Sequence, residues 1–473
     1  MKLKLIFIIF SLFSLLSCNQ DNKQTPEDFY IGGQIANPSS KYVIISKNDV
    51  NLDTLYLNDK NQFGGTLKNI KAGLYVFKHP PENQIIYLEP GDSTLVWLNT
   101  LAFDESINFS GKGSEKSNFL TNLYLLNQQD NNFILNYYKL DPSEFAQKTD
   151  SIRSERQQRL LHLDKKYDLS EDFKKLANSS IDYEFYDLRE RYAFLIRKYY
   201  KEFVKKIPKD FHKYRKEISF NDENLQEYYV YLNLIDDYLR TKSLEYCDEN
   251  NIETQDCFNL NSNENIKRRI VLADSIIQNK KIKDIFLDRL AAQGIIYAQN
   301  TENIQSILDL LTKINYSGER LADLKQMAII QKELLPGYNI GGLKMRTTSK
   351  DTILLKDISR NPIITYYWSV NSQGHHRWQH KIIEDLREKY PEIDFIGINI
   401  DKNQFDPWVN VIKSNSYDPK FEFQLINIRV ENKLLKNYLN KLIFIETSGI
   451  IARGDAQLNT PDIETKILEF ISY

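Results

Sequence analysis

The residues Asn361-Pro-Ile-Ile-Thr-Tyr-Tyr-Trp368 form an apolar run that decides the fold of the last third of the chain. A run of this length, rich in β-branched and aromatic residues, predicts a buried strand. A helical stretch follows from His375 to Tyr390, and a second apolar run from Asp394 to Ile400 predicts the next strand. Strands that alternate with helices in this way indicate an α/β fold.

The same alternation continues to the end of the chain. The remaining expected elements are a helix from Phe405 to Lys413, a strand from Lys441 to Glu446, a hairpin turn at Thr447-Ser-Gly449 and a helix from Pro461 to Ile471. Pro336-Gly337 ends the preceding helices. We therefore assign residues 336–473 to one α/β domain.

Three motifs in this domain resemble those of the TlpA-like branch of the thioredoxin superfamily. Tyr367-Trp368 matches an aromatic-Trp pair that ends a buried strand, and Asp401 matches an acid that ends the next strand. Glu446-Thr-Ser-Gly449 matches an acid-x-x-Gly hairpin. The resemblance spans most of residues 336–473. It implies a thioredoxin-like fold, with thiol-disulfide chemistry at a Cys-x-x-Cys motif where a helix begins.

Other residues occupy the positions of the redox cysteines. Counted from Trp368, these positions are Ser372 and His375, and the family's cis-proline corresponds to Asn440. Dithiol exchange needs a thiolate nucleophile and a second, resolving thiol, and serine supplies neither. Ser372 with His375 or His376 as a base lacks an acidic orienter and a Gly-x-Ser-x-Gly elbow. We therefore expect no catalytic residue here, no cofactor and no active disulfide oxidoreductase.

A metal site is an alternative use of the same helix. His376 and His380 are one helical turn apart and Glu384 lies one turn further, so the three side chains share a helix face and are candidate zinc ligands. The histidines are expected to be exposed, either as ligands or as ordinary surface residues. The core face is expected to carry Trp378, Ile382 and Leu386.

The start of the chain predicts export and a lipid anchor. The apolar run from Leu5 to Leu16 follows two lysines, is too short to span a bilayer and leads into Ser17-Cys18. This order resembles the bacterial lipobox, which implies removal of residues 1–17 and acylation of Cys18. The polar residues 18–28 predict a flexible tether. We expect a bacterial cell-envelope lipoprotein, facing the periplasm or held at the outer membrane.

Two further regions lie between the tether and the α/β domain. Residues 29–113 contain short β-rich segments separated by turn signals such as Pro90-Gly91, which predicts an antiparallel β-sandwich. This region resembles the small β domain commonly found ahead of thioredoxin-like domains in such lipoproteins. Residues 114–335 show helical periodicity and predict an all-α region. The chain as a whole is expected to be a multidomain α+β protein.

Composition restricts the expected partners. Hydrophobic residues make up 41% and charged residues 27% of the chain, as in ordinary globular proteins. The net charge of −2 gives no electrostatic basis for binding nucleic acid. We expect the membrane as a partner, through the anchor, and an unidentified protein or small-molecule ligand.

Besides Cys18, the chain contains only Cys247 and Cys257, close together in a polar segment. An oxidising envelope permits a disulfide between them, whereas a reducing compartment leaves two free thiols.

Three functions fit these features. The first is a binding or scaffold role for a thioredoxin-like lipoprotein that has lost its dithiol. The second is a disulfide reductase or isomerase relative that uses Cys247 and Cys257 or a partner's thiols. The use of Cys247 and Cys257 requires them to lie close to Ser372. The third is metal binding through His376 and His380.

Overall fold

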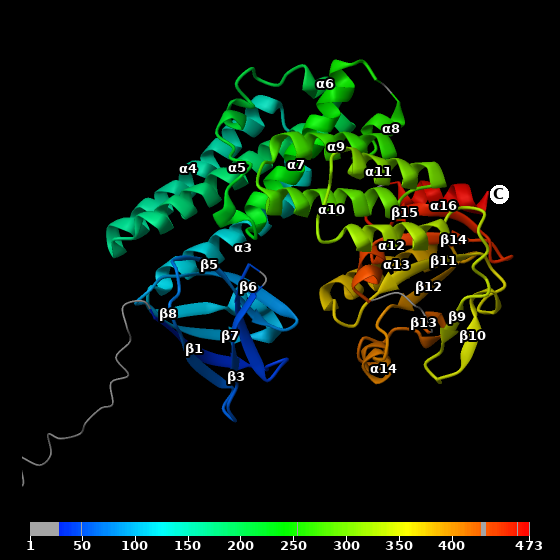
Figure 1. Ribbon diagram of the computed structural model, residues 1–473, viewed down its shortest axis with the longest axis horizontal. Coiled ribbons are helices and arrows are strands. Elements are labelled where there is room, and N and C mark those ends of the chain that lie inside the picture. The colour runs from blue at the N-terminus through cyan, green and yellow to red at the C-terminus, as the bar shows by residue number, and fades with distance from the viewer. Residues whose placement is uncertain (1–27, 49, 253, 427–431, 461, 473) are drawn as a thin grey trace, which may run out of the picture. The chain divides into compact units, whose positions relative to one another are not determined.

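The computed structural model describes residues 28–48, 50–252, 254–426, 432–460 and 462–472 (Figure 1). The predicted signal peptide, the lipidation site Cys18 and the tether up to residue 27 lie outside these residues. The chain divides into two compact units, Met1–Leu125 with Leu163–Lys174 and Leu126–His162 with Lys175–Tyr473. Within the described ranges, no helix combines the length and apolarity that crossing a bilayer requires.

The first unit contains two four-stranded sheets, with strand orders β4-β1-β7-β8 and β3-β2-β5-β6. The strands are β1 (Phe29–Ala36), β2 (Tyr42–Lys47), β3 (Val50–Tyr56), β4 (Gln62–Leu67), β5 (Gly73–His79), β6 (Glu82–Leu88), β7 (Ser93–Asn99) and β8 (Asn108–Lys112). Two short helical turns, η2 (Thr100–Ala102) and α2 (Phe103–Ser106), connect β7 to β8.

Buried side chains from both sheets form one core, because the strands alternate inward and outward residues. In β7, for example, Val96 and Leu98 are buried whereas Leu95 and Trp97 are exposed. The predicted antiparallel pairing was wrong at one place, where β1 and β7 pair in parallel along their length. The reason is topological: the chain builds the β5–β6 hairpin of the other sheet before β7 returns beside β1.

Helical residues of the first unit cover the outer face of β6. The Tyr87 backbone N–H donates to Ser117 Oγ at 3.1 Å, from the start of α3 (Ser114–Tyr137). The Tyr87 ring meets the Phe173 ring edge-on at a centroid distance of 5.0 Å. Strand β6 is therefore covered by elements of its own unit, whereas Leu52 and Tyr56 of β3 are exposed.

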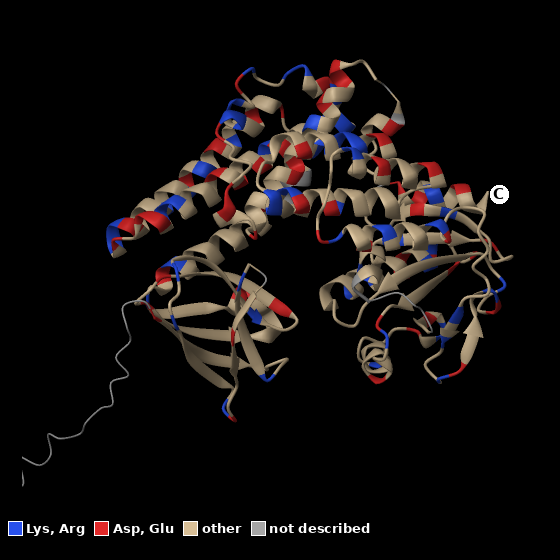
Figure 2. Cartoon of the chain, in the orientation of Figure 1, with Lys and Arg blue, Asp and Glu red and all other residues tan. Residues whose placement is uncertain are grey.

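The second unit begins with helices. They are the remainder of α3, α4 (Pro142–Tyr167), α5 (Glu171–Tyr199), α6 (Lys201–Val204), α7 (Tyr229–Glu249), α8 (Gln255–Phe258), α9 (Asn263–Ile276), α10 (Lys280–Ile296), α11 (Thr301–Lys313) and α12 (Leu321–Lys332), with 3-10 turns η3 (Lys213–Lys216) and η4 (Glu223–Leu225). Acidic and basic residues are interspersed along α4 and α5 (Figure 2). Side-chain caps start α9 at Ser262 and α10 at Asn279.

The C-terminal sheet has the order β10-β9-β13-β12-β11-β14-β15. Its strands are β9 (Lys344–Arg346), β10 (Thr352–Leu354), β11 (Ile363–Trp368), β12 (Asp394–Asn399), β13 (Glu422–Leu425), β14 (Lys441–Ile445) and β15 (Ile451–Gln457). The other elements are α13 (Gln373–Lys389), α14 (Phe405–Ser414), α15 (Asn432–Leu435) and α16 (Ile463–Ile471), with 3-10 turns η5 (Leu355–Asp357), η6 (Pro419–Phe421) and η7 (Lys436–Tyr438).

The strand directions agree with the fold that the sequence resemblance implied. Strand β11 pairs in parallel with β12 and antiparallel with β14, and β14 pairs antiparallel with β15. Every residue of β11 is buried, as expected for a central strand. The predicted strands and helices of this domain are present, whereas β9, β10 and β13 were not predicted.

A buried lysine joins this sheet to the helices of the same unit. Lys441, the first residue of β14, is fully buried. Its Nζ donates to Ile296 O at 2.6 Å and to Gln331 Oε1 at 2.9 Å, at the ends of α10 and α12. Burial lowers the pKa of Lys441 to about 7. The contact helps to explain why the helices and the sheet form one compact unit.

Candidate functional site

The loop between β11 and α13 is held by one buried carboxylate, that of Asp401. Its Oδ1 accepts a hydrogen bond from Ser369 Oγ at 2.8 Å, and its Oδ2 accepts one from the Val370 N–H at 2.7 Å. Asn371 Nδ2 donates to Oδ1 at 3.2 Å. Asp401, identified in the sequence as a strand-ending acid, therefore fixes the backbone immediately before Ser372.

The structure brings two of the three predicted redox positions into contact. Ser372 is the N-cap residue of α13, and its side chain makes no capping hydrogen bond. His375 lies in the first turn, and its Nε2 is 2.7 Å from Asn440 Oδ1. Asn440 stands directly before β14. The side chains at the positions that the sequence resemblance assigns to the second cysteine and the proline thus form a hydrogen bond with each other.

No activated nucleophile is formed at these positions. Among the described residues, no hydrogen bond links Ser372 Oγ to His375 or His376, since His375 bonds to Asn440 and His376 to Tyr417. A hydroxyl needs such a base to act as a nucleophile near neutral pH. Among the described residues, Ser372 therefore has no hydrogen-bonded base.

The two histidines further along α13 are buried, and the expectation that they would be exposed was wrong. His376 is 1% exposed and His380 is 3% exposed. Conversely Trp378, expected in the core, is 39% exposed. The buried face of α13 instead consists of His376, Gln379, His380, Ile383 and Leu386. Imidazoles occupy a core face here because buried polar groups across the sheet provide hydrogen-bond partners.

Tyr417 contacts both of these rings. Its hydroxyl is 2.8 Å from His376 Nδ1, and its ring stacks on that of His380 at a centroid distance of 3.5 Å with an interplanar angle of 5°. Burial raises the pKa of Tyr417 to about 12, so the hydroxyl keeps its proton at neutral pH. The stack fixes the orientation of both imidazoles.

Glu422, a fully buried residue of β13, is the centre of the network. Its Oε1 accepts from Tyr366 Oη at 2.7 Å, and its Oε2 accepts from Trp368 Nε1 at 2.9 Å. The chain makes room for this carboxylate at the neighbouring strand, because a Cβ on Gly397 would stand 2.3 Å from Glu422 Oε2. A glycine in a buried strand was the sequence signal for a bulky neighbour, and sequence reasoning missed it.

His380 connects the backbone of α13 to Glu422. Its Nδ1 is 2.7 Å from the His376 carbonyl oxygen, and because a carbonyl only accepts, Nδ1 carries a hydrogen. Its Nε2 is 3.2 Å from Glu422 Oε1. The imidazole therefore links α13 to the buried carboxylate of β13.

His376 is held neutral. Burial is the main cause that lowers its pKa to about 4, and the nearby His380 and Arg377 act in the same direction. Its Nε2 has no hydrogen-bond partner among the described residues. Protonation of this buried ring would therefore destabilise the folded protein.

The predicted metal site is not formed. His376 and His380 lie on the buried face of α13, whereas Glu384 is exposed. Within the part of the chain that the structure describes, no group of three His, Cys, Asp or Glu residues is arranged to hold a metal ion. The i, i+4 spacing was correct for one helix face, but that face turned out to be the core face.

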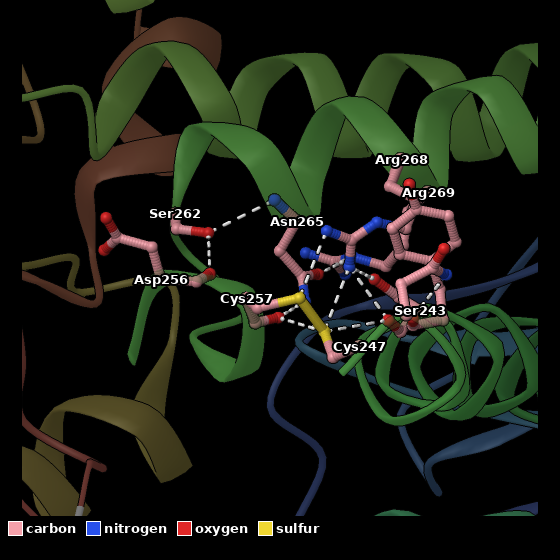
Figure 3. Close-up of a disulfide and its surroundings, with 10 residues drawn as sticks. Ser243, Cys247, Asp256, Cys257, Ser262, Asn265, Arg268 and Arg269 are labelled. Carbon is pink, nitrogen blue, oxygen red and sulfur yellow. Dashed lines mark hydrogen bonds between the residues drawn. A yellow bond between two sulfur atoms is a disulfide. The ribbon is translucent and has the colours of Figure 1, made fainter. Parts of the chain in front are cut away.

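Cys247 and Cys257 form a disulfide between α7 and α8 (Figure 3). Both cysteines are buried. Arg268 of α9 donates from Nη1 to Cys247 Sγ and from Nη2 to Cys257 Sγ, each at 3.4 Å. Its guanidinium also lies over the Tyr246 ring, 4.4 Å from the centroid. The disulfide and Arg268 form one packed cluster of the helical region.

This disulfide belongs to a different part of the second unit from Ser372. α7 and α8 pack on α9, α9 packs on α10, and α10 contacts η7 at the C-terminal sheet. Among the described residues, the two cysteines form hydrogen bonds with Ser243, Asn265 and Arg268 but with no residue of α13. The proximity to Ser372 that the second function requires is therefore not found.

Removing the disulfide is expected to destabilise the helical region. The Cys247→Ser, Cys257→Ser double variant should lose about 2–3 kcal/mol of unfolding free energy, because the cross-link closes a short loop in the unfolded chain. Urea unfolding without reductant measures this loss. A Cys18→Ser variant is the matched control, and a loss equal to that of the control would contradict the expectation.

Comparisons with known proteins give a partial likeness. No family model and no curated protein matches this chain. A thioredoxin-like protein from Bacteroides caccae is 14% identical, with 59% of this chain and 94% of that chain covered and a TM-score of 0.31. The thioredoxin domain of a thiol-disulfide oxidoreductase from Bacteroides vulgatus is 13% identical, with 29% and 99% covered and a TM-score of 0.22.

Proposed function

We propose that this chain is a thioredoxin-like envelope lipoprotein that binds a partner protein or a small-molecule ligand without thiol-disulfide exchange. One observation carries the proposal: Ser372 and His375 stand where the family resemblance places the cysteines, and His375 is hydrogen-bonded to Asn440. A hydroxyl and an imidazole transfer no electrons to a disulfide.

The other cysteines support the same proposal. Cys247 and Cys257 are buried and bonded to each other within the helical region. A reactive cysteine needs an exposed thiolate, and neither sulfur provides one. Cys18 is assigned to the lipid anchor, on the sequence order that resembles the lipobox. This anchor would hold the protein at the outer membrane or facing the periplasm.

An insulin-reduction assay with dithiothreitol tests the chemistry. The chain without residues 1–18 is expected to stay at the uncatalysed rate, and so is its Cys247→Ser, Cys257→Ser variant. Catalysis by the unaltered chain that disappears in the double variant would overturn the proposal, because the helical disulfide would then be the redox site.

A gain-of-function variant tests whether the site is correctly placed. Ser372→Cys combined with His375→Cys puts two thiols at the start of α13, where the helix N-terminus lowers the pKa of a thiol. We expect this variant to form an internal disulfide and to reduce insulin above the uncatalysed rate. Either single variant is the matched control, since one thiol cannot resolve a mixed disulfide. If the double variant forms no disulfide, the assignment of these two positions is wrong.

A further inference from the structure

The outer face of the sheet β4-β1-β7-β8 is open to solvent. In β7, Leu95 is 49% exposed and Trp97 is 52% exposed, and Leu101, just after the strand, is 81% exposed. In the other sheet of the same unit, α3 and Phe173 pack against β6, whereas Leu52 and Tyr56 of β3 are exposed. Large apolar side chains grouped on one exposed face indicate an interaction surface.

Glycines make this face flat beside Tyr30. The Tyr30 hydroxyl lies 2.8 Å from the position of a Cβ on Gly32 and 2.6 Å from that of a Cβ on Gly64, so the ring extends over both glycines. Gly32 is paired with Leu95 across β1 and β7. Tyr30, Leu95 and Trp97 therefore form one apolar surface, which we call the Trp97 face.

The Trp97 face carries almost no charge. Strands β1, β4 and β7 contain no charged residue, and β8 contains only Lys112, so these strands are nearly all tan in Figure 2. The neighbours of Trp97 in the sheet are the neutral amides Gln34 and Asn108. These strands contribute no carboxylate, so they can approach anionic or zwitterionic lipid head groups without repulsion.

The number of residues between Cys18 and Asp28 limits how far this face can lie from an anchor at Cys18. Asp28, the first described residue, directly precedes β1, and Tyr30 follows two positions later. About ten residues separate Cys18 from Asp28, and a chain of that length spans at most about 35 Å. An acyl anchor at Cys18 would therefore hold the edge of the Trp97 face within that distance of a bilayer.

We propose that the Trp97 face lies on the phospholipid surface to which the chain is anchored. Trp97 and Tyr30 would occupy the interfacial region of the bilayer. Their apolar rings would be buried there, and their N–H and O–H groups would stay hydrated. Leu95 would reach toward the acyl chains. The tether raises the local concentration of this face at the membrane, so a weak intrinsic affinity suffices. This inference rests on the lipid anchor of the proposed function.

Quenching by brominated lipid tests the docking. The full chain, purified from membranes and reconstituted in phosphatidylethanolamine–phosphatidylglycerol vesicles, is compared with its Trp97→Phe variant. We expect bromine-labelled acyl chains to quench Trp97, so that the variant loses most of the quenched signal. Trp378→Phe, which removes an exposed tryptophan of the other unit, is the matched control and should leave the quenching unchanged.

The mass of the N-terminal peptide separates the two possible failures. If the peptide carries acyl chains at Cys18 and bromolipids leave Trp97 unquenched, the docking inference is overturned and the anchor stands. If the peptide is not acylated, the anchor fails and the docking inference falls with it. Quenching that persists in Trp97→Phe and disappears in Trp378→Phe would place a different surface on the membrane and overturn the inference.

Discussion

Replacing Glu422 by alanine is expected to lower the free energy of unfolding by about 3–5 kcal/mol. The carboxylate accepts hydrogen bonds from Tyr366 and Trp368, and its Oε1 lies 3.2 Å from His380 Nε2. Its removal leaves three buried polar groups without their partner, and the cost of desolvating each of them is no longer offset. Urea unfolding monitored by circular dichroism measures the loss.

Glu384→Ala is the matched control for this prediction. Glu384 is an exposed carboxylate of α13, and its loss should change the unfolding free energy by no more than about 0.5 kcal/mol. A Glu422→Ala variant as stable as the control would show that the buried network contributes nothing to stability. The double variant Glu422→Ala, His380→Ala should cost less than the sum of the single variants, because the two residues interact directly.

His376 is expected to make the protein less stable in acid. The unfolded chain binds a proton on this residue below a pKa of about 6.5, whereas burial lowers the pKa of the folded protein to about 4. Between these values the unfolded state binds more protons, so stability falls as the pH falls. The loss accumulates at about 1.4 kcal/mol per pH unit and reaches about 3 kcal/mol near pH 4.

The comparison with His376→Phe isolates this contribution. Burial raises the pKa of Glu184 to about 7, which favours the folded state in acid and opposes the effect of His376 in wild type and variant alike. The contribution of Glu184 cancels in the difference in unfolding free energy between the two proteins, measured from pH 8 to pH 4. We expect it to stay constant above pH 7 and to shift in favour of the variant below pH 6. A difference independent of pH would contradict a neutral, buried His376.

Both predictions concern the support of the candidate site. His380, on the buried face of α13, contacts Glu422 and Tyr417, and Asp401 orders the loop before the helix. Ser372 and His375 are therefore presented by a helix whose buried side is fixed by hydrogen bonds. A rigid presentation of this kind suits binding, since little conformational entropy is lost when a partner docks.

The buried network was beyond the reach of sequence reasoning. Glu422 lies far along the chain from Tyr366 and His380, and the strand that carries it was not predicted. Polar residue types at helical spacing indicated an exposed face for His376 and His380. Burial depends on which groups lie opposite, and here those groups come from β11, β13 and Tyr417.

The sequence by itself determined β11, α13, β12, α14, β14 and α16 of residues 336–473, because apolar periodicity depends only on local spacing, but it did not show β9, β10 or β13. Its resemblance to the thioredoxin superfamily also predicts Ser372, His375 and Asn440 as the positions of the missing dithiol and proline. The tertiary structure alone decided that His375 meets Asn440 and that β1 pairs in parallel with β7. It likewise decided that His376 and His380 are buried around Glu422. These features join residues distant in sequence, and their energies depend on burial and mutual orientation, which local patterns do not encode.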